Sequence, residues 1–127
     1  MENNSIDIDS LKTFINDALN ESGKIALSYF RKVRDLSLKG DSSPVTLVDK
    51  EIEKFLREKI SSSYPTDNIT GEEYDTLDKN SNVHWIIDPI DGTRSFVAGK
   101  YDFGTLIAIV ENNEAVSYTH LTLPTKA

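Results

Sequence analysis

Two aspartates and a glycine–threonine pair follow a short apolar stretch in the second half of the chain. The apolar stretch, residues 83–87, ends at Asp88, and Asp91, Gly92 and Thr93 follow within the next few positions. An apolar run bounded by proline and glycine predicts a buried strand that stops abruptly. Carboxylates at a strand end can hold a hard cation, and exposed amides after a glycine can face an anion. These residues therefore predict a site for magnesium and a phosphate group.

Two further acids stand at junctions of predicted elements. Glu72 follows Gly71 after a short predicted strand, and Asp49 stands three residues after Thr46 at a predicted helix start. Oxygen-only ligands select magnesium, calcium or manganese over zinc. Two metals about 3.5–4 Å apart could share a carboxylate and stabilise both the attacking and the leaving oxygens of a hydrolysis. Each acid alone is more often a solvated surface group, and a threonine with an acid three residues later is also an ordinary helix N-terminus.

Two helices and several strands must position these acids. Apolar residues at three- and four-residue spacing predict a first helix with Ser10 as its N-cap, ending at about Lys32. A second helix is predicted from near Thr46 until Pro65 stops it. Strands are predicted over residues 67–70, 83–88 and 105–110, and a hairpin turn over 111–114. This order indicates an α+β fold in which two long helices pack on an antiparallel sheet.

The composition excludes several classes of function. The chain has 127 residues and a net charge of −7, which fits one domain but not a protein that binds a nucleic-acid backbone. It has no cysteine, so thiolate nucleophiles and sulfur-ligated zinc are excluded. The longest apolar runs fall short of the roughly 20 residues that span a bilayer, and the N-terminus lacks a secretory signal. We expect a cytoplasmic protein without nucleic-acid or membrane partners.

We interpret the last residues of the chain as having a different origin from the rest. Residues 116–125, VSYTHLTLPT, resemble the translated read-through of a transposase adapter used in sequencing libraries. A native strand is the alternative, because Tyr118, Thr119 and Leu121 are acceptable strand formers. We expect that residues 1–115 carry the metal and phosphate motifs and that residues 116–127 are a non-native tail.

The motifs together resemble the inositol monophosphatase family of magnesium-dependent phosphomonoesterases. The resemblance is carried by residues 43–56 (SPVTLVDKEIEKFL), residues 71–73 (GEE) and residues 85–96 (WIIDPIDGTRSF). It extends from about Lys39 to Val110. It implies the N-terminal half of a layered αβαβα sugar-phosphatase fold.

Within that family, the chain is most similar to the histidinol-phosphatase branch. This likeness is carried by residues 92–96, Gly99 and residues 103–108. Relatives that act on inositol phosphates tend to have threonine and asparagine where Arg94 and Ser95 stand. The expected substrate is therefore histidinol phosphate, an intermediate of histidine biosynthesis, and an inositol or sugar phosphate is the alternative.

The resemblance implies a role for each motif residue. It implies metal ligation of two or more Mg²⁺ ions, with Mn²⁺ as a substitute, by Glu72, Asp88, the Ile90 carbonyl and Asp91. It implies substrate contacts from Glu72, Ile90, Asp91, Gly92 and Thr93. It also implies that Thr93 and Asp49 activate the attacking water. A hydroxyl–carboxylate pair can orient a water and take its proton, and metal-bound water is a far better nucleophile than bulk water near neutral pH.

A non-catalytic metal-binding module is the alternative from another class, although a purely structural site needs no water-activating pair such as Thr93 and Asp49. The family takes a further aspartate ligand, and most residues that select the substrate, from a C-terminal half that this chain lacks. We therefore expect a fragment with little or no phosphatase activity. The expected partner is a small phosphorylated metabolite, and a homodimer stays open for the full-length protein.

Overall fold

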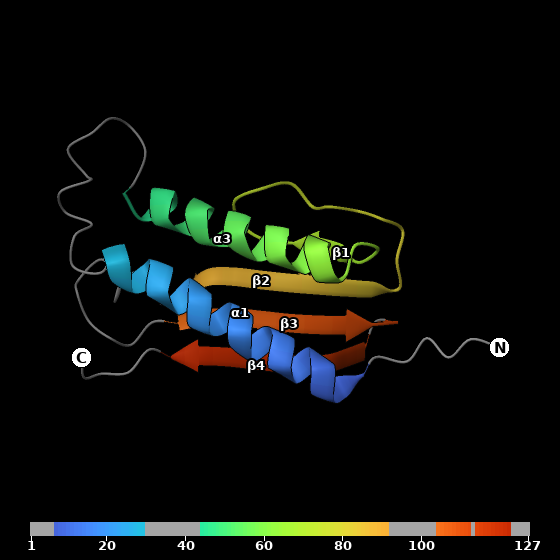
Figure 1. The fold of residues 1–127 in the computed structure, drawn as a ribbon. Helices are drawn as coiled ribbons and strands as arrows, with labels where there is room; N and C mark the ends of the chain where they lie inside the picture. The colour runs from blue at the N-terminus through green and yellow to red at the C-terminus, as the bar shows by residue number, and fades with distance from the viewer. Residues whose placement is uncertain (1–6, 30–43, 92–103, 113, 123–127) are drawn as a thin grey trace.

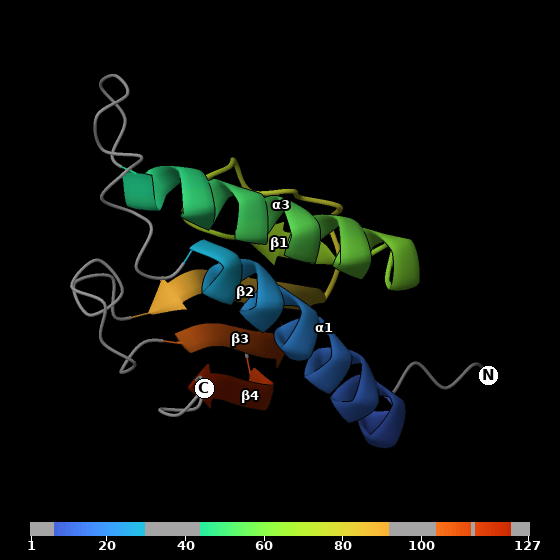
Figure 2. The same ribbon diagram turned by 60° about the vertical axis from the view of Figure 1, so that its left-hand side comes forward.

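The computed structural model describes residues 7–29, 44–91, 104–112 and 114–122. The elements in these ranges are, in chain order, α1 (Ile8–Tyr29), α3 (Pro44–Ser63), β1 (Asn68–Thr70), β2 (Val83–Asp91), β3 (Gly104–Glu111) and β4 (Glu114–Thr122). Both helices lie on the same face of the sheet, as Figure 1 and Figure 2 show from two directions. The predicted α+β layering of two long helices on a sheet is therefore confirmed.

Helix α1 is capped by Asp7, so the prediction of Ser10 as the N-cap was wrong. Oδ1 of Asp7 accepts hydrogen bonds from the amides of Asp9 (3.2 Å) and Ser10 (3.5 Å). The Ser10 hydroxyl donates to Oδ2 at 2.8 Å. These bonds, the one from the Ser10 hydroxyl foremost, lower the pKa of the Asp7 carboxyl below its usual value. Several good capping residues stand close together here, and spacing alone did not separate them.

Helix α3 begins at Pro44, two residues before the predicted start. Proline suits the first turn of a helix, because its missing N–H would have no partner there and its φ is already helical. The predicted end of α1 near Lys32 lies outside the described residues. No helix in the described ranges is both long and apolar enough to cross a membrane.

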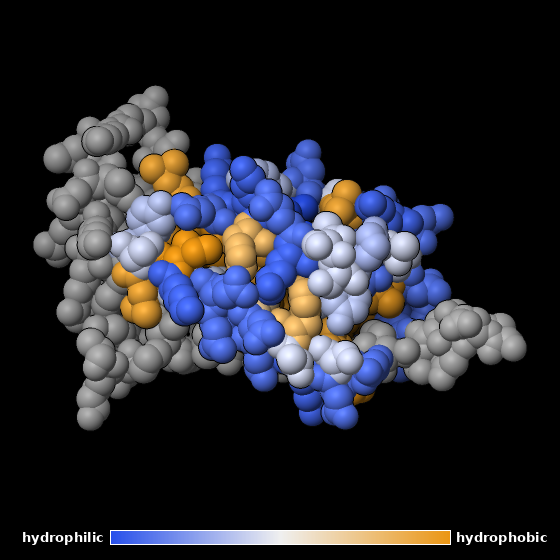
Figure 3. Space-filling model, in the orientation of Figure 1, coloured by the Kyte–Doolittle hydropathy of each residue, from blue (hydrophilic) through white to orange (hydrophobic). Residues whose placement is uncertain are grey.

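The core lies between the helices and the sheet, as the helical spacing predicted. Its buried side chains from α1, α3, β2 and β3 include Leu11, Ile15, Leu19, Val48, Ile52, Leu56, Ile60, Trp85, Ile87, Ile107 and Ile109. The Trp85 ring contacts Phe14 and Tyr64, with ring centroids 5.6 Å and 5.2 Å apart. The outer face of the two helices is mostly hydrophilic with scattered apolar side chains (Figure 3). The apolar stripe of each helix therefore sets which face it turns to the sheet.

The sheet has the strand order β1-β2-β3-β4 and is mixed rather than wholly antiparallel. The pairs β2–β3 and β3–β4 are antiparallel, as predicted, but β1 pairs parallel to β2. Parallel pairing needs a crossover of about a dozen residues, and residues 71–82 supply it. The prediction of antiparallel pairing was wrong for β1 because strand patterns reveal the strands but not their partners.

Strand β2 does not stop at Asp88 as predicted. It continues through Pro89 to Asp91, and its register against β3 shifts between Asp88 and Asp91. Proline cannot donate to a strand ladder, and an irregularity is the usual way for a strand to accommodate it. Thr105 of β3 holds this segment, because its buried hydroxyl donates to the Pro89 carbonyl at 2.8 Å.

Strand β4 includes residues of the tail that we expect to be non-native. It pairs with β3 from Glu111↔Glu114 to Gly104↔Thr122. Without β4, β3 would be the edge strand of this sheet, and a sheet edge is a ready template for any segment with adequate strand propensity. Pairing of β4 is therefore compatible with either origin of the tail, and the expected boundary near Val116 stays a prediction.

Candidate metal and phosphate site

Three of the predicted site residues come together at one edge of the sheet. Because β1 and β2 run parallel, their C-terminal ends lie at the same edge. The β1–β2 pairing ends at Thr70↔Ile86, two residues before Glu72 on one strand and two residues before Asp88 on the other. The first turns of α3 lie on the same side of the molecule as the end of β2 (Figure 2), and they bring Asp49 to these carboxylates.

Asp49 is the most perturbed acid of this group. Its side chain is 8% exposed, and within the described part of the chain its Oδ1 is buried without a hydrogen-bond partner. Burial is the main reason that the pKa of Asp49 is raised to about 7, and nearby carboxylates add to the shift, in decreasing order Glu73, Asp88, Glu72 and Glu53. A buried carboxylate oxygen without a partner is costly, so the position favours either a proton or a cation.

Glu72 and Glu73 belong to the turn that follows β1. The Glu72 side chain is exposed and Glu73 is half-buried. Burial and the carboxylates of Glu53 and Glu72 raise the pKa of Glu73, whereas Lys50 acts in the opposite direction. The two residues therefore add negative charge to the surroundings of Asp49.

The remaining predicted residues are described in part or not at all. Ile90 lies in the last residues of β2 with its side chain buried in the core. The backbone of Asp91 ends β2, but its side chain lies outside the described part, as do Gly92 and Thr93 altogether. The predicted phosphate contacts and the pairing of Thr93 with Asp49 therefore stay predictions.

The acids around Asp49 offer the oxygen donors that hard cations prefer. Within the described side chains, no three groups of the metal-binding types lie close enough together to hold an ion. The carboxylates of Glu72 and Asp88 nevertheless act electrostatically on Asp49, and Oδ1 of Asp49 lacks a described donor. Oxygen ligands of this kind, with room for water and phosphate, are what Mg²⁺ binds in proteins.

Glu53 is the residue of this region that sequence reasoning missed. It is fully buried one helical turn after Asp49, and its carboxylate accepts hydrogen bonds from the amides of Glu72 and Glu73 at 2.9 Å and of Tyr74 at 3.2 Å. Helix α3 carries several charged residues, and the residue type alone did not distinguish Glu53 from the exposed ones. The available signal was its four-residue spacing from Asp49, which places both acids on one helix face.

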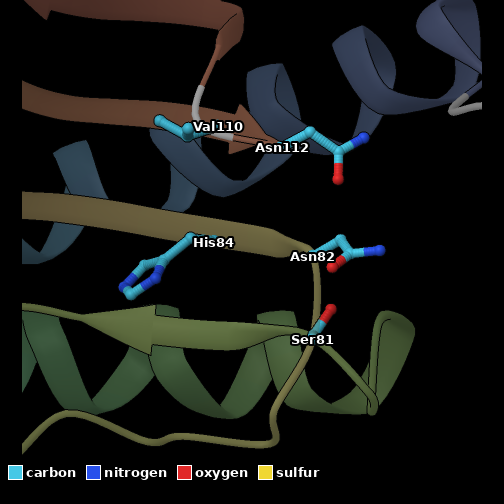
Figure 4. A pocket seen from close by; sticks show the side chains of 5 residues that line it. All are labelled: Ser81, Asn82, His84, Val110 and Asn112. Carbon is cyan, nitrogen blue, oxygen red and sulfur yellow. The ribbon is translucent and has the colours of Figure 1, made fainter.

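A separate polar hollow lies at the opposite end of β2. It has a volume of about 280 Å³ and is lined by Ser81, Asn82, His84, Val110 and Asn112, which Figure 4 shows around it. The His84 ring also shares a hydrogen bond with the Thr70 hydroxyl. Its described lining includes neither an aspartate nor a glutamate, so the acidic group at the other end of the strand is the better candidate for metal chemistry.

Comparisons with known proteins identify relatives of the whole arrangement. The sequence matches the model of the inositol monophosphatase family over residues 7–117. It is 42% identical over 90 residues to a histidinol-phosphatase of Chlorobaculum parvum, covering 70% of this chain and 35% of that protein. It is 43% identical over 84 residues to an inositol-1-monophosphatase of Bacillus subtilis, covering 62% of this chain and 32% of that protein.

A solved structure of an inositol monophosphatase from Zymomonas mobilis has the same fold. The TM-score is 0.77 at 31% identity, and the match covers 93% of this chain and 45% of that one. The expected fold, the N-terminal part of the family's structure, is confirmed by this match. The chain spans about a third of the length of the two curated relatives.

Proposed function

The chain belongs to the inositol monophosphatase family, and from this premise we propose that it is part of a magnesium-dependent phosphomonoester hydrolase. The observation that supports this proposal best is the buried Oδ1 of Asp49, which lacks a described hydrogen-bond partner and lies among other carboxylates. A cation at this edge of the sheet would neutralise these carboxylates. The phosphate of a bound metabolite would complete the coordination shell of that cation.

The proposal assigns the chemistry to this chain's own residues. Mg²⁺ would be held by Glu72, Asp88, the Ile90 carbonyl and Asp91. The phosphate would be held by Gly92 and Thr93. Mg²⁺, when bound, supplies charge neutralisation and a more acidic water. The Thr93 hydroxyl orients the water, and Asp49, whose Oδ1 lacks a described partner, accepts its proton. The phosphate of a small metabolite is the group recognised by this arrangement.

We further propose histidinol phosphate as the substrate. The sequence of residues 92–96 and the likeness to the Chlorobaculum histidinol-phosphatase support it. An inositol phosphate is the second candidate, because the Bacillus inositol-1-monophosphatase is similar at nearly the same identity. The test is Mg²⁺-dependent phosphate release by the full-length protein from both substrates. We expect kcat/KM to be at least about tenfold higher for histidinol phosphate, since a site that hydrogen-bonds one substrate discriminates strongly against another.

A preference for inositol phosphate would contradict the proposal of histidinol phosphate as the substrate but would agree with the proposed hydrolase activity. Release from neither substrate would favour the non-catalytic metal-binding module.

Asp49→Asn in the full-length protein separates an enzyme from a binding module. The amide cannot take a proton from water, so turnover should fall by about 10²-fold or more while most metal affinity remains. Phosphate release and Mg²⁺ binding by calorimetry are to be measured on the same preparation. Turnover within about threefold of wild type would contradict the role of Asp49 as proton acceptor.

We also propose that residues 116–127 are a non-native tail. The match to the family ends at residue 117, close to the expected boundary near Val116, which supports this proposal. The nucleotide sequence that encodes these residues is the test. Codons that follow the adapter sequence are expected, and an unrelated codon series would contradict the proposal.

A further inference from the structure

Glu53 is a buried charged residue for which the proposed chemistry has no use. Its side chain is 0% exposed, yet it is held by four donors. Oε1 accepts the amides of Glu72 and Glu73, and Oε2 accepts the amide of Tyr74 and Nε of Arg57. All four donors lie 2.8–3.2 Å from the carboxylate, so Glu53 holds the turn after β1 and is not a solvated acid on the helix surface.

The turn after β1 is pressed directly onto this carboxylate. A Cβ atom built on Gly71 would lie 2.3 Å from Oε2 and 2.4 Å from Cδ of Glu53. Contacts this short do not occur, so any side chain at position 71 would have to push Glu53 or the turn away. A side chain at position 71 therefore needs the Glu53 carboxylate or the turn to move, and the hydrogen bonds of that carboxylate oppose the move.

Arg57 closes the same turn from its other end. Its Nε pairs with Glu53 Oε2 at 2.8 Å, and its Nη2 donates to the carbonyl of Tyr74 at 3.0 Å. The guanidinium also lies over the Tyr74 ring, 5.8 Å from the centroid. Two residues of one helix face, Glu53 and Arg57, thus bind both the N–H side and the C=O side of the turn.

We propose that Glu53 is the positioning residue of the metal site: its buried carboxylate fixes the Gly71–Tyr74 turn and so aims Glu72 at the cation. This inference rests on the proposed function, because it needs Glu72 to be a ligand. The Glu72 side chain is exposed, so its placement depends on its backbone, and Glu53 binds that backbone directly. Residues that orient a metal ligand typically change metal affinity about 10–100-fold when they are replaced.

The test compares Glu53→Gln with Glu58→Gln in this chain, using Mn²⁺ as the probe. Glutamine keeps the shape of Glu53, but its NH₂ group must face N–H donors whichever way it turns, so the turn is released. Glu58 is an exposed glutamate of the same helix and controls for the loss of one charge. Free Mn²⁺ is measured by electron paramagnetic resonance below the melting transition, and exchange of the Glu72–Tyr74 amides by NMR.

We expect Glu53→Gln to weaken Mn²⁺ binding by about 10-fold or more and to accelerate exchange of those amides, with Glu58→Gln within about twofold of wild type. A second variant, Gly71→Ala, keeps Glu53 and displaces the same turn by placing a Cβ against its carboxylate. It is expected to weaken Mn²⁺ binding while amides at the far end of the sheet stay protected from exchange.

Three other results of the Mn²⁺-binding experiment would each contradict a different part of the proposal. A folded Glu53→Gln or Gly71→Ala variant that binds Mn²⁺ as wild type does would contradict the positioning role and leave the metal site standing. A weakening shared equally by Glu58→Gln would reduce the role to one of net charge and so overturn it. A wild-type chain that binds no Mn²⁺ would contradict both the proposed metal site and the positioning of Glu72 within it.

Discussion

Asp49 is the residue of the candidate site whose pKa is raised the most by its surroundings. Its pKa is raised to about 7, first by burial and then by the carboxylates around it. Below about pH 7, the neutral form of Asp49 is thus favoured in the folded chain when no cation is present. Two of the carboxylates that disfavour its charge in the apo state, Asp88 and Glu72, are among the ligands that we propose for Mg²⁺.

This shift predicts how the stability of the metal-free chain depends on pH. The folded chain binds the Asp49 proton more tightly than the unfolded chain does, so stability falls as pH rises from about 4 to about 7 and levels off above. The slope from this residue is at most about 1.4 kcal/mol per pH unit. Thermal unfolding in EDTA across this range should show it, and Asp49→Asn should flatten it. An equal slope in both proteins would contradict the assignment to Asp49.

At the scale of elements, helix α3 does two things at once. Its apolar stripe, Val48, Ile52, Leu56 and Ile60, is fully buried against the sheet. The face that carries Asp49 and Glu53 points to the turn after β1. The position of the site residues therefore depends on how firmly the stripe docks.

The chain offers a matched pair of leucines to measure that docking. Leu56 is 0% exposed and Leu47 of the same helix is 47% exposed. Leu56→Ala should lower the free energy of unfolding by about 2–5 kcal/mol through lost burial and a cavity. Leu47→Ala should change it by less than about 0.5 kcal/mol. Urea unfolding followed by circular dichroism measures both, and similar losses for the two variants would mean that the stripe is not what holds α3.

The same elements show which features follow from local sequence. The helices and the strands after them were predicted because their periodicity is a property of neighbouring residues. The parallel pairing of β1 and the passage of β2 through Pro89 were not, since both depend on a partner strand.

The candidate site divides in the same way. Glycine-led turns and strand ends indicated Asp49, Glu72 and Asp88, and the structure brings these acids together. The burial of Glu53 could not be predicted, because it depends on a turn that is distant in sequence and closes over it.

At the scale of the whole molecule, the described chain covers only one face of its sheet. Trp85 and Ile87 are buried toward the helices, whereas Ile86, between them, points the other way and is 43% exposed. Leu106, Ala108 and Val110 of β3 are half-buried in the same alternating pattern. Within the described residues, the second face of the sheet therefore leaves apolar side chains such as Ile86 partly open. The chain spans only a part of its relatives' length.

The chain as it stands should therefore be a poor catalyst. The ligands that the family supplies from its C-terminal half are expected to complete the site, so the 127-residue chain should release little or no phosphate from histidinol phosphate in the presence of Mg²⁺. A phosphate-release assay beside the full-length protein measures this. Robust Mg²⁺-dependent release by the chain alone would contradict the need for the second half.

Anomalous scattering from Mn²⁺ in crystals of the chain tests the metal site most directly. The predicted result is a Mn²⁺ peak at the sheet edge, in ligating contact with the carboxylates of Glu72 and Asp88 and close to Asp49. The absence of a peak there at saturating Mn²⁺, or peaks only elsewhere on the surface, would contradict the proposal that these acids form a metal site.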